Sequence, residues 1–186
     1  MKEGWLGRAW RASAHPGDFF ATLPDDARLG AAARPALLSL TVGASVMAFA
    51  IGRATASDAW LPILLFVVPG MILYGATLWL VGGMTLARAA ALDLRGWEIA
   101  GWAWVPTGFL ALSLLPVAAV FPVTSLVVGT LGLPVWHLAV VAAGLKTFSG
   151  RRPGRALLFY ALVVLAVPIT AMAISLLAIL ATGTGG

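Results

Sequence analysis

Residues 99–145 read IAGWAWVPTGFLALSLLPVAAVFPVTSLVVGTLGLPVWHLAVVAAGL, and this run contains no Asp, Glu, Lys or Arg. As one continuous helix it would be roughly 70 Å long, because an α-helix rises about 1.5 Å per residue. That length is more than twice the hydrocarbon thickness of a bilayer, which is about 30 Å. The run is therefore expected to fold back on itself in a membrane and to form two spanning helices.

Prolines place the turn of this hairpin. Pro116 and Pro122 flank its middle, and proline both lacks an N–H donor and disfavours helix in the residue before it. We therefore expect a short turn near residues 117–124. Thr124 and Ser125 follow, and their hydroxyl groups could cap the second helix of the hairpin.

Further uncharged runs occupy residues 35–52, 59–87 and 156–186. Each can supply one helix of the about 20 apolar residues that cross a bilayer. Composition agrees, since 61% of the residues are hydrophobic and 10% are charged, against about 45–50% and about 25% in soluble domains. The sequence predicts an all-α, polytopic membrane bundle of five transmembrane helices. The expected spans are about 35–52, 60–87, 98–116, 124–145 and 156–181.

The basic residues predict the orientation. The chain has 12 Lys and Arg against 7 Asp and Glu, a formal net charge of +5. With five spans and the N-terminus inside, every basic residue except Arg53 lies on the inner side. With four spans, the basic loop at 146–155 would move outside. The positive-inside rule favours five spans in a cell (plasma or inner) membrane with a cytoplasmic N-terminus. Because the basic residues lie between apolar runs, no nucleic-acid partner is expected.

The expected domains are a cytoplasmic tail, 1–34, and a transmembrane domain, 35–182. Phe19, Phe20 and Leu23 should form the apolar face of a short turn after Pro16 and Gly17, which break the preceding helix. That preceding helix has apolar residues at three- and four-residue spacing, namely Trp5, Leu6, Ala9, Trp10 and Ala14. Such a pattern suits an amphipathic helix in the headgroup plane. The tail could be an interfacial anchor or a docking surface for a cytoplasmic partner.

His137 is the histidine that falls inside a predicted span. An ionisable group within a membrane is a candidate functional site. A metal site needs three or four ligands, and no other His, Asp or Glu lies deep in a predicted span, so no metal is expected. Two interpretations stay open: a neutral His137 hydrogen-bonded inside the bundle, or a polar contact on a substrate or proton path.

Asp93 and Glu98 flank Arg95 in the predicted loop between spans two and three. Paired carboxylates could perform acid–base chemistry, but structural roles are expected. Glu98 should begin span three, where the helix dipole favours an acid, and Asp93 can pair with Arg88 or Arg95. The chain has no cysteine, which excludes thiolate chemistry. With no catalytic or cofactor-binding residue identified, neither enzymatic activity nor a cofactor is expected.

A compact basic loop is predicted between spans four and five. Its basic residues are Lys146, Arg151, Arg152 and Arg155. Such clusters attract anionic lipid headgroups, and they also set topology. The loop could therefore bind lipid or a partner specifically, or serve topology alone.

Several short segments resemble one membrane-protein family. The third predicted span reads Gly101-Trp102-Ala103-Trp104-Val105-Pro106. Further similar positions are Trp136, Gly144-Leu145-Lys146 and Arg155-Ala156-Leu157, together with Pro16 and Phe19-Phe20 in the tail. These segments resemble prokaryotic members of the Yip domain family, first named as interactors of Ypt/Rab GTPases.

The resemblance implies five spans, a cytoplasmic N-terminus and no known enzymatic activity. Eukaryotic members have an Asp-Leu-Tyr-Gly-Pro motif before the first span, and this chain lacks it. The leading functional expectation is a non-enzymatic membrane-organising or adaptor protein, with membrane lipids and either a protein partner or further copies of itself as partners. The alternatives are a small transporter, channel or lipid-handling protein, and then a membrane enzyme. A hydrated polar cavity reaching His137 would favour transport.

Overall fold

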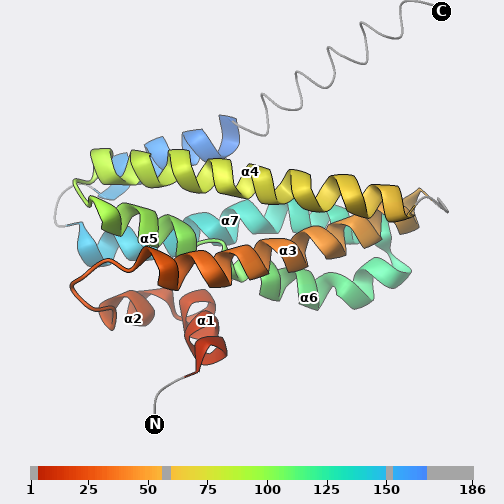
Figure 1. Ribbon diagram of the computed structural model, residues 1–186, viewed down its shortest axis with the longest axis horizontal. Helices are drawn as coiled ribbons and strands as arrows, with labels where there is room; N and C mark the ends of the chain where they lie inside the picture. Colours follow the sequence, from red (N-terminus) through yellow and green to blue (C-terminus); the bar gives the residue numbers. More distant parts are fainter. Residues whose placement is uncertain (1–3, 56–59, 150–152, 167–186) are drawn as a thin grey trace, which may run out of the picture.

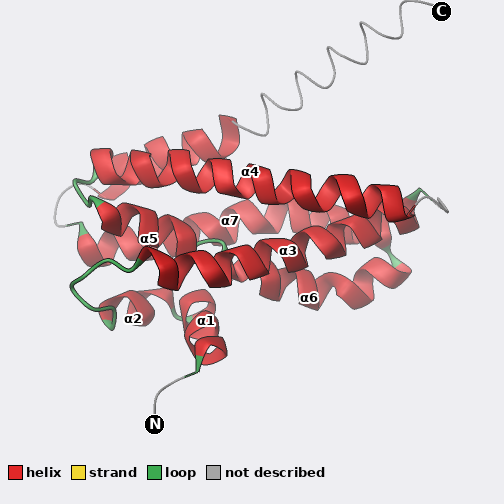
Figure 2. Ribbon diagram, viewed as in Figure 1, coloured by secondary structure: helices red, strands yellow, loops and turns green. Residues whose placement is uncertain are grey.

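The computed structural model describes residues 4–55, 60–149 and 153–166 (Figure 1). Within these ranges every regular element is helical and no strand is present (Figure 2). The helices are α1 (Trp5–Ala14), α2 (Pro16–Ala21), α3 (Leu29–Ala54), α4 (Trp60–Ala89), α5 (Leu94–Trp102), α6 (Val105–Val120) and α7 (Pro122–Phe148). A shorter apolar helix, Pro153–Ala166, follows them.

Four helical segments are long and apolar enough to cross a membrane. They are Leu29–Ala54, Ile63–Ala89, Leu94–Val120 and Pro122–Phe148. The predicted all-α bundle of membrane-type helices is thus confirmed, and each of the first four predicted spans overlaps one of these segments. The fifth predicted span, 156–181, begins in the helix Pro153–Ala166, and its residues 167–181 lie outside the described residues. The count of five stays a prediction.

The hairpin turn is shorter than expected. Helix α6 ends at Val120 and α7 begins at Pro122, so Phe121 alone joins two helices that pack against each other. Pro122 takes the first position of α7, where the missing N–H would have had no helical partner. The prediction that Thr124 or Ser125 caps this helix is therefore wrong, because both residues lie inside α7, past its start.

A break separates α5 from α6 at Ala103 and Trp104. Its cause is Pro106, which has no N–H to donate to the carbonyl of Trp102 one turn earlier. The next donor, Thr107 N–H, bonds the carbonyl of Trp104 at 3.1 Å. The segment 94–120 is therefore one membrane-length unit with a kink near its first third.

Small residues let this kinked unit approach α3 closely. A Cβ on Gly101 would lie 2.8 Å from Cβ of Ala32, and a Cβ on Gly108 would lie 2.9 Å from Oγ of Ser39. Glycine removes the atoms that would keep two helices apart. The close approach of α3 to the α5–α6 unit depends on these positions.

The tail is folded onto the bundle. In Figure 1, α1 runs across the long helices, whereas α3, α4, α6 and α7 lie along one another. Helix α2 packs against α7, and both of its phenylalanines, Phe19 and Phe20, are buried. Helix α3 begins at Leu29, earlier than the predicted boundary at residue 35. We call the end of the bundle that carries residues 22–28 and the α4–α5 turn the tail end.

Candidate functional site

His137 lies in α7, and only 4% of it is exposed. Its Nε2 atom is 2.7 Å from the hydroxyl oxygen of Tyr160, which lies in the helix Pro153–Ala166 and is fully buried. The two rings are stacked with their centroids 5.7 Å apart. Trp104 covers His137 from another side, at 4.6 Å in an edge-on arrangement. The kink at Trp104 thus completes an aromatic enclosure around the imidazole.

This enclosure favours the first of the two interpretations of His137. The cavities found along α1, α3 and the outer face of α7 do not include His137 in their walls. Within the described residues, no group of three or more His, Asp and Glu side chains lies together. The surroundings of His137 therefore suit a polar cross-link between two helices, and the absence of a bound metal stays a prediction.

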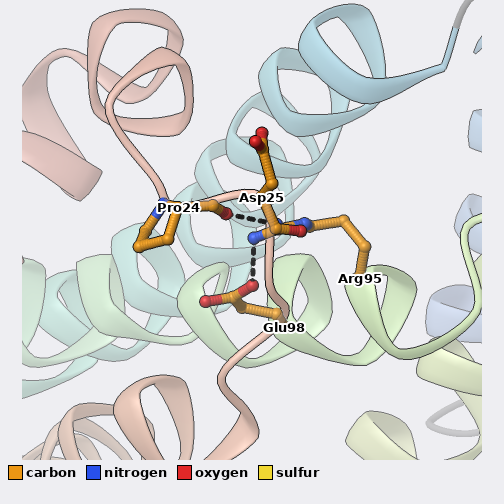
Figure 3. A network of polar contacts seen from close by, with 4 residues as sticks. All are labelled: Pro24, Asp25, Arg95 and Glu98. Atoms are coloured by element: carbon orange, nitrogen blue, oxygen red, sulfur yellow. Dashed lines mark hydrogen bonds and ion pairs between the residues drawn. The ribbon is translucent and has the colours of Figure 1, made fainter.

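A second polar cluster lies at the tail end, where Arg95 and Glu98 form a buried ion pair (Figure 3). Arg95 also donates from Nη2 to the carbonyl oxygens of Pro24 and Asp25, the latter at 2.6 Å. Its guanidinium carbon lies 4.5 Å from the centroid of the Phe148 ring. One side chain from α5 therefore holds the segment between α2 and α3.

The expected roles of the carboxylates need correction. Asp93 pairs with neither Arg88 nor Arg95 among the described ion pairs; it is exposed and has a positive φ of 43° in the α4–α5 turn. Glu98 is not in the first turn of its helix, because α5 begins at Leu94. Its role is to neutralise Arg95. The three-residue spacing of Arg95 and Glu98 could have indicated this pair, but no sequence signal indicated the tail carbonyls.

The two tryptophans of the family-like motifs both contact the tail. Trp102 meets Phe19 edge-on, with ring centroids 4.6 Å apart. Trp136 donates its indole N–H to the carbonyl of Ser13 at 3.0 Å. The structure therefore brings these distant positions together at the surface on which α1 and α2 lie, a role that sequence reasoning did not assign to them.

The other motif positions act in helix packing. Pro106 causes the break described above, and Gly101 faces α3. A Cβ on Gly144 would lie 2.8 Å from Cγ2 of Ile99, so this glycine allows α7 to approach α5. None of the three offers a polar side chain to a ligand.

The predicted lipid-binding loop is described only in part. Lys146, at the end of α7, is exposed. Arg155 is also exposed, and its guanidinium carbon lies 5.6 Å from the centroid of the Phe159 ring. Arg151 and Arg152 lie outside the described residues. The lipid contacts of this loop stay a prediction.

Comparisons of the chain with protein-family models, with curated protein sequences and with solved structures gave no match. The resemblance to the Yip domain family therefore stays a prediction. Conclusions about function rest on the contacts of the chain itself.

Proposed function

We propose that the chain is a non-enzymatic, Yip-like protein that crosses a cell (plasma or inner) membrane five times and acts as a membrane-organising adaptor. In this proposal the tail end faces the cytoplasm. The N-terminal helices are then a folded platform on the cytoplasmic side, available to a protein partner or to another copy of the chain.

The attachment of the tail carries this proposal. Helices α1 and α2 bury Ala9, Ala12, Phe19 and Phe20 against the bundle. Gly17 and Asp18 nevertheless stay exposed on α2. The buried guanidinium of Arg95 holds the connection between α2 and α3 through the carbonyls of Pro24 and Asp25. A tail that served only as a membrane anchor would not need this contact. The enclosed His137 also supports an adaptor over a transporter, because a translocation path through it would require a hydrated route.

Site-specific photo-crosslinking in cells tests the proposal. A photoreactive residue at Asp18 should give a discrete protein adduct, whereas the same residue at Thr124, exposed at the opposite end of the bundle, should not. Equal adducts at both positions would contradict a cytoplasmic platform. A chain that gives no protein adduct at Asp18, but supports solute flux in proteoliposomes that His137→Phe abolishes, would be a transporter instead.

A further inference from the structure

A groove of about 610 Å³ lies between α1, the start of α3 and Trp102. Its volume is within the range of about 300–1,000 Å³ that is usual for small-molecule sites. Arg8 and Arg34 provide the charge, and Trp5 and Leu38 provide apolar surface; among the described residues, no Asp or Glu lines it. The groove is thus both basic and apolar.

Neither arginine has a carboxylate partner among the residues that the structure describes. The ion pair between Arg95 and Glu98 involves neither Arg8 nor Arg34. Arg8 is held in place by Trp102, since its guanidinium carbon lies 5.5 Å from the centroid of that ring. A positioned cation that no described carboxylate neutralises is suited to an anionic ligand.

The position of the groove along α3 indicates a lipid. Arg34 directly precedes the uncharged run that begins at Pro35, so a bilayer that covers this run would bring Arg34 to the level where headgroups meet hydrocarbon. Leu38 lies one helical turn further along that run. Trp5 is 55% exposed on α1, the helix that crosses the bundle (Figure 1), and tryptophan is favoured at the interface of a bilayer. The basic part of the groove is therefore followed by an apolar part, in the same order as the phosphate and the acyl chains of a phospholipid.

We propose that this groove binds one anionic phospholipid from the leaflet at the tail end. Its phosphate lies between Arg8 and Arg34, and the start of an acyl chain lies against Leu38. The inference rests on the proposed residence in the membrane and not on the adaptor role. A lipid in this groove would fill the space between α1 and α3, and would couple the position of the tail to lipid composition.

Gly30 permits a test that leaves the charges in place. It lines the groove, and a Cβ built on it would meet no atom within 4 Å. Gly30→Phe should therefore fill the groove while α3 keeps its helix, because glycine is the weaker helix former. Arg8→Gln with Arg34→Gln removes the charges. Arg88→Gln, an exposed arginine in the last turn of α4 and outside the groove, is the matched charge control.

The measurement is native mass spectrometry of the full chain released from nanodiscs that contain equal phosphatidylglycerol and phosphatidylcholine. We expect one retained phosphatidylglycerol in preference to phosphatidylcholine. Each single Arg→Gln change should lower its relative occupancy about five-fold, and the double change about thirty-fold. Gly30→Phe should lower it as well, and Arg88→Gln should not.

Three outcomes would overturn the proposal. The first is retention at the parental level in both Gly30→Phe and the double arginine variant. The second is an equal loss in Arg88→Gln, which would indicate bulk surface charge. The third is displacement of the lipid by inorganic phosphate at millimolar concentration, which would indicate a site for free anions. Protein crosslinking at Asp18 does not depend on any of these three outcomes, so the adaptor proposal is tested separately from the lipid proposal.

Discussion

The Nε2 atom of His137 lies 2.7 Å from the hydroxyl oxygen of Tyr160, and this hydrogen bond joins α7 to the helix Pro153–Ala166. Both side chains are buried. A buried polar group is costly unless it is paired. The bond therefore favours one rotation of the last described helix about its own axis, the rotation that brings Tyr160 to face α7.

Removing the hydroxyl should destabilise the bundle. Tyr160→Phe leaves Nε2 of His137 without this partner, so we expect the free energy of unfolding to fall by about 0.5–2 kcal/mol. A double-mutant cycle with His137→Phe, measured by reversible unfolding in mixed micelles, should give a coupling energy of about 0.5–1.5 kcal/mol. Strictly additive losses would show that the two side chains do not stabilise each other.

Breaking the ion pair at the tail end should be more costly. Arg95→Gln leaves Glu98 buried without its cation, and we expect a loss of about 3–5 kcal/mol in the free energy of unfolding. The double variant Arg95→Met with Glu98→Leu should recover most of that loss, because it buries no charge. The same unfolding assay measures both variants.

The double variant should nevertheless release the tail, because the carbonyls of Pro24 and Asp25 lose their donor. The chain has no cysteine, so a nitroxide can be attached at Asp26→Cys alone. Its spectrum should show faster motion in the double variant than in the parent, whereas a label at Thr55→Cys, at the other end of the bundle, should be unaffected. Unchanged motion at residue 26 would mean that Arg95 does not hold the tail.

Gly96 should tolerate no side chain. A Cβ there would lie 2.6 Å from the backbone nitrogen of Ala87 and 3.1 Å from the carbonyl oxygen of Gly83. Backbone atoms cannot move aside by rotation of a side chain, so Gly96→Ala should lower the free energy of unfolding by about 1–3 kcal/mol. Gly70→Ala is the matched control: a Cβ there meets nothing within 4 Å, and stability should change little or rise by up to about 1 kcal/mol. Equal stability of the two variants would contradict the close packing of α4 on α5.

The five-span proposal makes a prediction about topology. Reporter fusions placed after Gly150 and after Gly186 should report opposite faces of the membrane, because the fifth span separates them. The reason is the concentration of basic residues on one side, which the positive-inside rule places in the cytoplasm. Reporters on the same face at both positions would refute five spans.

Hydropathy alone determined the kind of fold. Hydrocarbon cannot hydrogen-bond a peptide group, so a run such as 99–145 must be helical and must turn within the thickness of a bilayer. Pro122 then marked the start of α7 to within a few residues. Helix α3 extends ahead of the span expected from residue 35. Its first residues, from Leu29 to Arg34, include a charge and pack on α5 where Ala32 meets Gly101, and hydropathy takes no account of such packing.

Only the tertiary structure decided which polar groups meet. The sequence placed His137 within a predicted span, but it did not indicate Tyr160 as its partner. It singled out Arg95 and Glu98, but it did not indicate that Arg95 donates to the carbonyls of Pro24 and Asp25. The physical reason is that an apolar pattern shows that a helix is buried in lipid or protein. It does not show how that helix is rotated about its axis relative to neighbouring helices that are distant in the sequence. That rotation comes from close contacts between helices, such as those at Gly101, Gly108 and Gly144, and it places each polar side chain opposite its partner.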